Sequence, residues 1–350
     1  MNHARKLIWM WVCCTAVAWA FEEITPEQTR SAERAMQWMV KAQNADGSWG
    51  MDIRTPSDIA ATSMAAMALL AAGNTDRDGP DPACVKAVKK AVDYLLMRAR
   101  KMRPGGDIAE GEQSEMQTYV GQRTHTFFAT IFLSQIYGSR CLDLPPESYS
   151  EIKGVLIKLT DSISSSQDAD GSWHKETYSS LQATAFAWMA LRSAGSCGVP
   201  IKHAAVTRVI KFIKSQYNPP THLFGRNNTN QIYATASAMR IVYGMGDWDE
   251  PQNKAAADTM LKSIADVNQG FLTNCGEDFL ASTLVTHALI KQGGDRWKTW
   301  FTFVRTRLLR TQNGDGSWTA TSCLRGRTFP TACALLCLHT PSRLLPIQDL

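Results

Sequence analysis

The chain has 350 residues, of which 44% are hydrophobic and 20% are charged, and its formal net charge is +5. These values are typical of a globular protein with a substantial core, and no biased tract indicates disorder. The charge is mild and there is no basic stripe with interleaved aromatic residues, so a nucleic acid is not expected as a partner.

The first twenty residues are predicted to be a signal peptide. Arg5 and Lys6 form a short basic start, and an apolar run of fourteen residues then extends to Ala20. A basic start, a short apolar run and small residues at its end are typical of a cleaved leader, and the run is too short to span a bilayer comfortably. We therefore expect cleavage near Ala20 and export, leaving residues 21–350 as one domain without a transmembrane segment.

Amphipathic helices recur through the rest of the chain. The first begins after a capping box at Thr25 with proline at the first helical position, and its residues Ala32, Met36, Met39 and Val40 share one face. Further amphipathic stretches lie around residues 85–96, 152–163, 206–213, 260–267 and 301–308.

A more apolar helix, opened by a pair of small residues, follows each amphipathic one. The pairs are Ala61-Thr62, Ala129-Thr130, Ala183-Thr184, Ala234-Thr235, Ala281-Ser282 and a looser Pro330-Thr331, separated by 68, 54, 51, 47 and 49 residues. Steps near 50 residues fit a helix pair with two connections, and nothing predicts a β-ladder. The pattern predicts an all-α toroid of six helix pairs with inner and outer rings, and an open solenoid is the competing architecture.

Three near-identical loops end helices of the more polar kind. Each reads Gln-x-x-Asp-Gly-Ser-Trp, at Gln43–Trp49, Gln167–Trp173 and Gln312–Trp318. Asp-Gly favours a tight turn, a glutamine amide can bond exposed backbone groups, and tryptophan supplies a large apolar face. The loops are interpreted as clasps between adjacent helix pairs, and the alternative is that their tryptophans bind substrate.

This motif, recurring at helix-pair spacing, resembles that of squalene–hopene cyclases, oxidosqualene cyclases and protein prenyltransferase β-subunits. The stretch from Gly293 to Ile347 looks like an exported bacterial branch of that superfamily. The resemblance covers nearly all of residues 25–350. It implies a closed α/α toroid and an isoprenoid or other lipid ligand in a central cavity.

The sequence lacks the acidic motif that the activity implied by the resemblance requires. Class II cyclases protonate an alkene with Asp-x-Asp-Asp, because that step needs a strong carboxylic acid. The nearest strings here are Asp168-Ala169-Asp170, inside a clasp loop, and Asp247-Trp248-Asp249-Glu250, in a connection. The chain also has length for one toroid, whereas a triterpene cyclase resembles two in tandem.

The prenyltransferase resemblance implies zinc held by Asp, Cys and His at inner-helix starts, but the Asp-x-Cys pair of that family has no match. A different set is available: Cys275, Glu277 and Asp278 precede the fifth inner helix and Cys323 precedes the sixth, with Cys275, Asp278 and Cys323 as the metal candidates. A disulfide, a metal site or free thiols all fit these cysteines, and His125 or His339 could complete a metal set. Cys275-Gly276-Glu277-Asp278 is also similar to the Cys-Gly-Glu-Gln of thioester toroids, but Asp278 stands where the thioester needs glutamine.

The mouth of the toroid is the predicted functional site, because the inner helices' N-termini converge there and favour anions. The candidate catalytic residues are Asp58, His125, Glu176, Tyr178, Glu277, Asp278 and Arg327. Helix capping and ordinary salt bridging are the alternative roles. A polar insertion over residues 103–122 is either a lid for this mouth or a solvated loop.

Three functions stay open at this point. An enzyme or enzyme relative acting on an isoprenoid or lipid would have an apolar, aromatic-lined cavity, and a scaffold that binds a protein partner would have a filled or narrow one. A polysaccharide-active toroid would instead have an open polar groove with opposed carboxylates, for which Glu176, Glu277 and Asp278 are available.

Overall fold

The computed structural model describes residues 24–345 except 78, 80, 175–178, 226–230 and 267–270. The predicted signal peptide lies outside the described residues, as do two mouth candidates, Glu176 and Tyr178. Across the described ranges, no helix combines the length and the hydropathy needed to cross a bilayer.

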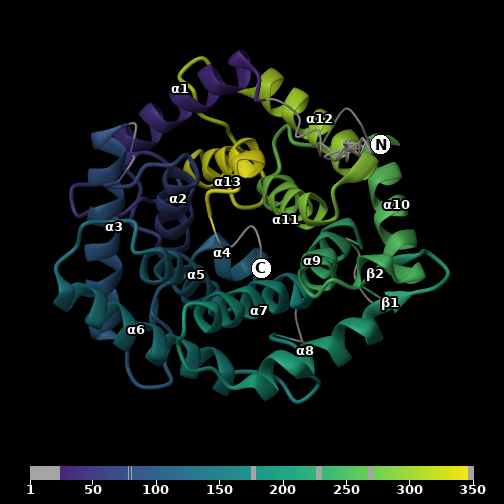
Figure 1. Ribbon diagram of the computed structural model, residues 1–350, viewed down its shortest axis with the longest axis horizontal. Coiled ribbons are helices and arrows are strands. Elements are labelled where there is room, and N and C mark those ends of the chain that lie inside the picture. Colours follow the sequence, from purple (N-terminus) through teal and green to yellow (C-terminus); the bar gives the residue numbers. More distant parts are fainter. Residues whose placement is uncertain are drawn as a thin grey trace, which may run out of the picture.

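In the part of the chain that the structure describes, twelve long helices form two concentric rings (Figure 1). The outer ring consists of α1 (Pro26–Ala42), α3 (Pro82–Lys101), α6 (Pro146–Ser165), α8 (His203–Gln216), α10 (Pro251–Asp266) and α12 (Gly294–Thr311). The inner ring consists of α2 (Ile59–Ala71), α5 (Thr124–Ser139), α7 (Ser180–Ser196), α9 (Gln231–Gly244), α11 (Gly276–Gln292) and α13 (Thr328–His339).

The connections carry the smaller elements. They are α4 (Glu115–Tyr119), the antiparallel strands β1 (Tyr217–Asn218) and β2 (Leu223–Phe224), and the short 3₁₀ helices η1 (Asp247–Asp249) and η2 (Thr340–Ser342).

The ring is closed. Each inner helix contacts its two inner neighbours, α13 contacts α2, and α1 contacts both α12 and α13. An open solenoid would leave the first and last pairs apart, so the predicted all-α toroid with inner and outer rings is confirmed.

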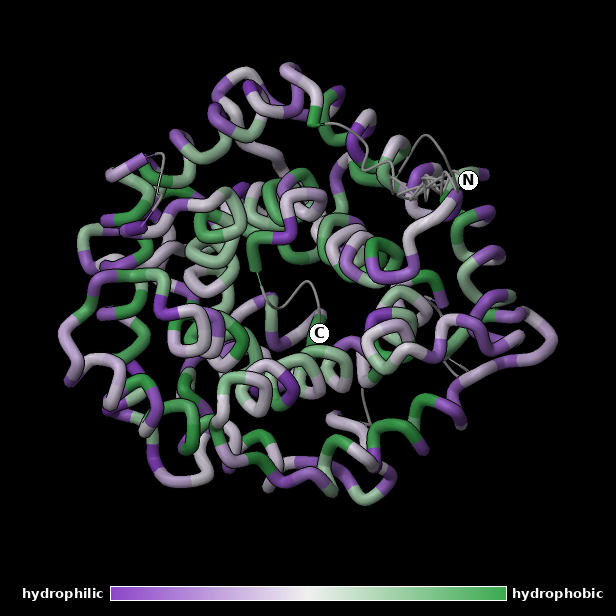
Figure 2. The backbone as a smooth tube through the Cα atoms, viewed as in Figure 1, coloured by the Kyte–Doolittle hydropathy of each residue, from purple (hydrophilic) through white to green (hydrophobic). Residues whose placement is uncertain are grey.

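Composition explains which helices lie inside. Outer helices such as α3 bury one face, including Cys84, Val88 and Leu95, and expose the other. Every residue of α2 is buried, and a helix that is apolar all round is stable only when surrounded by protein. In Figure 2 the strongly hydrophilic residues accordingly concentrate on the outer ring, while the inner helices are mostly pale or green. Their many alanines, serines and threonines let six helices pack around one axis.

The Gln…Trp loops make the same contacts three times. Each indole is fully buried, and its Nε1 donates to a carbonyl of the outer helix that precedes the loop. Each glutamine Nε2 donates to a carbonyl of the next outer helix. The indole bonds are Trp49 to Met39 (2.8 Å), Trp173 to Ile163 (3.0 Å) and Trp318 to Leu308 (2.9 Å), and the amide bonds are Gln43 to Ala87, Gln167 to Ala205 and Gln312 to Ser31, all 2.8 Å.

The third loop joins the two ends of the chain. Gln312 bonds Ser31 twice, through the backbone carbonyl and through the Ser31 hydroxyl, each at 2.8 Å. Gly316 has φ +94°, and a Cβ there would lie 2.6 Å from the carbonyl oxygen of Arg34 on α1. The turn therefore requires glycine both for its backbone conformation and for the close approach of α12 to α1.

The threonines of the small pairs accept a backbone N–H from the preceding loop. Thr62, Thr184, Thr235 and Thr331 do so at 2.9–3.0 Å. In the second and fifth pairs the acceptors are instead Thr126 (3.3 Å) and Asp278 (3.1 Å), one helical turn before the predicted Thr130 and Ser282. Residues four apart share a helix face, so the sequence alone does not show which of the two polar residues is the acceptor.

We predict that Gly316→Ala lowers the free energy of unfolding by about 2 kcal/mol or more, because alanine is strained at positive φ and its Cβ would press on α1. Gly314→Ala is the matched control, since nothing lies within 4 Å of a Cβ at that position. Urea unfolding of both variants measures the difference. Equal stability of the two would show that the loop does not hold the ring closed.

Candidate functional site

The predicted mouth residues separate into three places. Asp58 and His125 lie together at the starts of α2 and α5, and Glu277 and Asp278 lie in the first turn of α11. Arg327 is elsewhere: its guanidinium pairs with Asp52 (2.8 Å) and Asp315 (3.3 Å) and lies over the Trp38 ring. Arg327 therefore ties α13 to the clasp loop and the outer helix α1.

The insertion at 103–122 reaches across the mouth, with α4 near the centre of the ring in Figure 1. Glu115 accepts the backbone N–H of Arg325 at 2.7 Å and pairs with its guanidinium. The Tyr119 hydroxyl shares a hydrogen bond with the Cys323 thiol. The segment leaves α3 and contacts the loop before α13, on the far side of α2, so it crosses the mouth, and we call residues 103–122 the lid.

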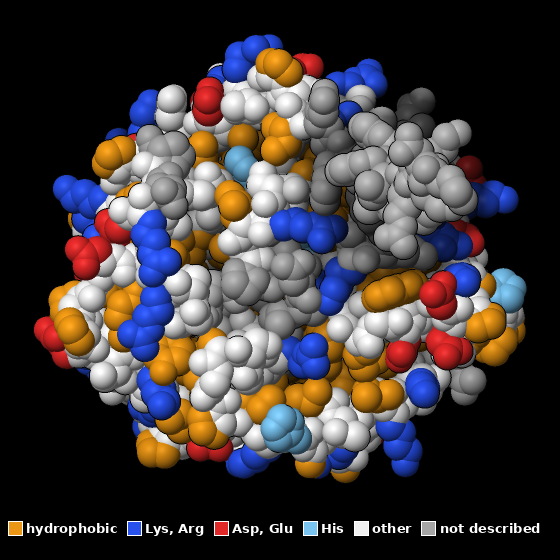
Figure 3. All heavy atoms as spheres, in the orientation of Figure 1, with side chains coloured by type: hydrophobic (Ala, Val, Ile, Leu, Met, Phe, Trp, Pro, Cys, Tyr) orange, Lys and Arg blue, Asp and Glu red, His pale blue; other side chains and the backbone are white. Residues whose placement is uncertain are grey.

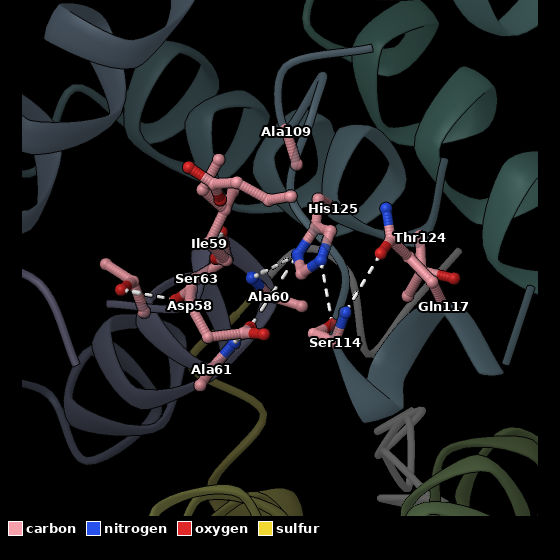
Figure 4. A network of polar contacts seen from close by, with 12 residues as sticks. Asp58, Ile59, Ala60, Ala61, Ser63, Ala109, Ser114, Gln117, Thr124 and His125 are labelled. Atoms are coloured by element: carbon pink, nitrogen blue, oxygen red, sulfur yellow. Dashed lines mark hydrogen bonds and ion pairs between the residues drawn. The ribbon is translucent and has the colours of Figure 1, made fainter. Parts of the chain in front are cut away.

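His125 fastens this lid to the inner ring (Figure 4). Its Nδ1 accepts the Ala60 N–H at 3.1 Å, and its Nε2 lies 3.0 Å from the Ser114 hydroxyl in the lid. Asp58 Oδ1 is 3.7 Å from Nδ1 and accepts the Ala61 N–H at 2.8 Å, which caps α2.

The order Ser114–His125–Asp58 is that of a nucleophilic triad, but the proton lies on the wrong nitrogen. Because Nδ1 accepts the Ala60 N–H, the imidazole proton sits on Nε2 and is donated to Ser114. An imidazole in this tautomer cannot take the serine proton, which a triad requires. Asp58 and His125 thus act here as a helix cap and a lid tether.

A second group, which we call the mouth cluster, consists of Cys275, Glu277 and Cys323. One ligand atom of each lies within 4.8 Å of the others. The backbones are held together because the Gly276 N–H donates to the Cys323 carbonyl at 2.9 Å. A Cβ at Gly276 would lie 2.4 Å from that oxygen, so glycine is needed for the approach. Both cysteines are free thiols in the structure, as are Cys84, Cys141, Cys197, Cys333 and Cys337.

Asp278 is not part of this cluster, and its carboxylate has other partners. Its Oδ1 accepts the Tyr233 hydroxyl at 2.7 Å and its Oδ2 accepts the Leu272 N–H at 3.1 Å. Adjacent residues on a helix point about 100° apart, and the carboxylates of Glu277 and Asp278 accordingly take different partners. Of the two carboxylates available to the predicted metal set, the cluster therefore contains Glu277 and not Asp278.

Acidic groups gather around the cluster and make one another hard to ionise. Burial and the neighbouring Cys275 and Glu277 raise the pKa of the Cys323 thiol to about 12. The Cys323 sulfur raises the pKa of Tyr119, and burial together with Asp278 and Cys275 raises that of Tyr233. A bound cation would lower each of these pKa values, since it favours the ionised forms.

Two features of the cluster were not foreseen from the sequence. Tyr119, Tyr233 and Gln182 contact it from the lid, α9 and α7, and Gln182 Nε2 donates to Glu277 at 3.1 Å. Their positions follow from ring closure and carry no local motif. Cys323 and Leu324 also adopt positive φ (41° and 54°), a strained backbone of the kind found at functional sites.

Aromatic rings fill the interior of the ring near the mouth. The Phe128 ring of α5 lies 4.6 Å from that of Phe186 on α7 and 6.3 Å from that of Phe329 on α13, and all three are buried. Because α2 stands between α5 and α13, the rings can meet only inside the inner ring. The interior at this level is apolar, aromatic and packed.

No protein-family model matches the sequence, and no curated protein is similar to it. Among solved structures, the type II terpene cyclase MstE from Scytonema matches at a TM-score of 0.57 and 16% identity, covering 91% of this chain and 99% of that chain. A complex of an MstE variant with its substrate, geranylgeranyl dihydroxybenzoate, matches at 0.57 and 14%, covering 91% and 98%.

A second kind of toroid matches equally well. An inactive variant of an α-1,6-mannanase from Salegentibacter, in complex with α-1,6-mannotetrose, has a TM-score of 0.57 at 11% identity and covers 91% of this chain and 99% of that chain. These likenesses establish the fold, the terpenoid cyclase-like α/α toroid that the Gln…Trp motif predicted.

We predict that His125→Leu lowers the free energy of unfolding by about 1–3 kcal/mol, because it leaves the buried Ala60 N–H without an acceptor. Ser114→Ala frees the lid but keeps that bond, so a glutamate-specific protease should cleave both variants faster than the wild type at the exposed Glu110, with Ser114→Ala losing less stability. Urea unfolding and timed proteolysis check this. A Ser114→Ala variant as unstable as His125→Leu would contradict the assigned tautomer.

Proposed function

We propose that this terpenoid cyclase-like toroid binds a transition-metal ion at the mouth cluster, with zinc as the best match. The observation that carries the proposal is the convergence of Cys275, Glu277 and Cys323 within 4.8 Å. Thiolates and a carboxylate are ligands that zinc takes, and three protein ligands leave a fourth position for substrate or water, as in catalytic sites.

The surroundings fit a cation. Zinc binding requires deprotonated thiols, which the raised pKa of Cys323 opposes when no cation is bound. Gln182 holds Glu277 by its amide, and the Tyr119 and Tyr233 hydroxyls lie against the two sulfurs. Such outer hydrogen bonds orient metal ligands and tune their basicity.

The bound ion would supply a Lewis acid or an activated water at the open position. The chain's own residues would do the rest. The lid, fastened through Glu115 and His125, would limit the access of water to the mouth. The Tyr119 and Tyr233 hydroxyls can each hold a proton beside a ligand sulfur.

As ligand we propose an isoprenoid or another molecule with an apolar chain, held at the mouth above the packed phenylalanine rings. The MstE complex with a geranylgeranyl compound and the aromatic interior support this choice. We do not propose proton-initiated cyclisation. Asp170 accepts two bonds from Ser172 inside its clasp loop, and Asp249 lies in η1 on the outer side, paired with Lys254.

A non-catalytic scaffold is the second candidate, and the packed interior favours it, because Phe128, Phe186 and Phe329 leave little room at their level.

For either candidate function, we propose that the chain is exported after cleavage near Ala20. N-terminal sequencing of the secreted chain tests it, and an intact Met1 would contradict it.

We predict that the purified chain binds about one equivalent of zinc by elemental analysis after dialysis against a weak chelator. Cys275→Ser and Cys323→Ser should each lower zinc affinity at least about tenfold, since each removes one of three ligands. Cys197→Ser is the control, because that thiol lies at the opposite end of α7. A wild type that binds no zinc, or equal binding by all three variants, would refute the metal site.

Mass spectrometry of the same preparation for co-purified lipid separates the two candidate functions. An isoprenoid or other apolar ligand bound at one equivalent would support the enzyme-like reading. Recovery of neither metal nor lipid, and no binding of added prenyl compounds, would support the non-catalytic scaffold.

A further inference from the structure

The end of the ring opposite the mouth carries a groove that the metal proposal does not use. It lies where α1 begins and where α2 and α13 end, and it has a volume of about 450 Å³. Its lining residues are Ile24, Gln28, Thr29, Ala32, Glu33, Met36, Gln37, Ala72, Asp81, Leu338, His339, Ser342 and Leu344. This volume lies within the roughly 300–1,000 Å³ typical of small-molecule sites.

Exposed apolar side chains gather at this groove. Within the described ranges three large hydrophobic residues are exposed, and two of them, Ile24 (43%) and Leu344 (52%), line it. Figure 3 shows hydrophobic side chains beside a histidine in the upper part of the face, over α1 and α13. Apolar surface is unfavourable in contact with water. An apolar chain that lies on this surface would therefore bind through the hydrophobic effect.

Two residues that line the groove each have a buried side-chain atom without a hydrogen-bond partner. Gln28 is 1% exposed, and its Nε2 donates to the Leu338 carbonyl at 2.6 Å, which fixes the amide orientation. Its Oε1 is left without a donor, and the Nε2 of His339 is also unpartnered. A buried polar atom without a partner destabilises the protein, so a group that bonds both atoms would gain by binding here.

The charge of the groove selects the kind of head group. Its rim carries the carboxylates of Glu33 and Asp81, and its lining includes neither lysine nor arginine. Burial lowers the pKa of His339 to about 4, so the imidazole is neutral near pH 7. A carboxylate or phosphate head would meet like charges and find no cation.

We infer that this groove binds an uncharged amphiphile, an apolar chain with a hydroxyl head. The hydroxyl donates to Gln28 Oε1 and completes a hydrogen bond with His339 Nε2, while the chain covers Ile24, Met36 and Leu344. A hydroxyl suits this pair because it is donor and acceptor at once. The site is separate from the mouth cluster, since the twelve residues of α13 between them span roughly 18 Å.

Displacement of a neutral fluorescent probe, N-phenyl-1-naphthylamine, from the full chain tests the inference with three competitors of equal chain length. 1-Octanol should compete at least about tenfold better than methyl octyl ether, which cannot donate to Gln28 Oε1, and better than octanoate, which the rim repels. Equal competition by the ether would reduce the groove to an unspecific apolar surface, and preference for octanoate would overturn the charge argument.

Two variants on the same helix locate the effect. Gln28→Met should abolish the preference of octanol over ether, and Gln37→Met, an exposed glutamine of the same groove, should keep it. Zinc content should be unchanged in both, so failure here is distinguishable from failure of the metal site. Sedimentation showing that wild type dimerises, and that Leu344→Ser does not, would assign the groove to a second copy and overturn the inference.

Discussion

The structure depends on six inner helices that have no solvent face of their own. Helices such as α2, buried over its whole length, gain stability only when neighbours surround them. Ring closure supplies those neighbours, and the clasp loops enforce it by joining each preceding outer helix to the next through a glutamine amide. The bond between Gln312 and Ser31 matters most, because it joins residues 281 positions apart and completes the circle.

Ring closure also brings together the residues of the mouth cluster. Parallel inner helices bring their N-termini to one end, so the loop before α11 meets the loop before α13 and Cys275 comes beside Cys323. Without a cation the Cys323 thiol and the Tyr119 and Tyr233 hydroxyls stay protonated, since burial and the neighbouring acidic groups raise their pKa values. A ring held shut by its clasps can sustain this arrangement beneath the lid.

The two ends of the toroid differ in what they offer a ligand. The mouth concentrates acidic groups under a lid, the interior near it is packed with Phe128, Phe186 and Phe329, and the far end presents an apolar groove with unpartnered polar atoms. The proposed activities therefore belong to the ends of the ring. Terpene cyclases and a mannanase share the same scaffold, which shows how little the toroid alone constrains chemistry.

By itself the sequence determined the helices, their pairing and the loops that close the ring, because hydrophobic period and the Gln…Trp repeat are local signals. It also placed Cys275 and Cys323 at matching depth. Only the tertiary structure decided that Glu277 and not Asp278 joins them in one cluster, that Arg327 pairs away from the mouth, and that Tyr119 arrives from the lid. Those outcomes depend on helix rotation and on contacts between distant segments, and no local pattern of residues encodes either.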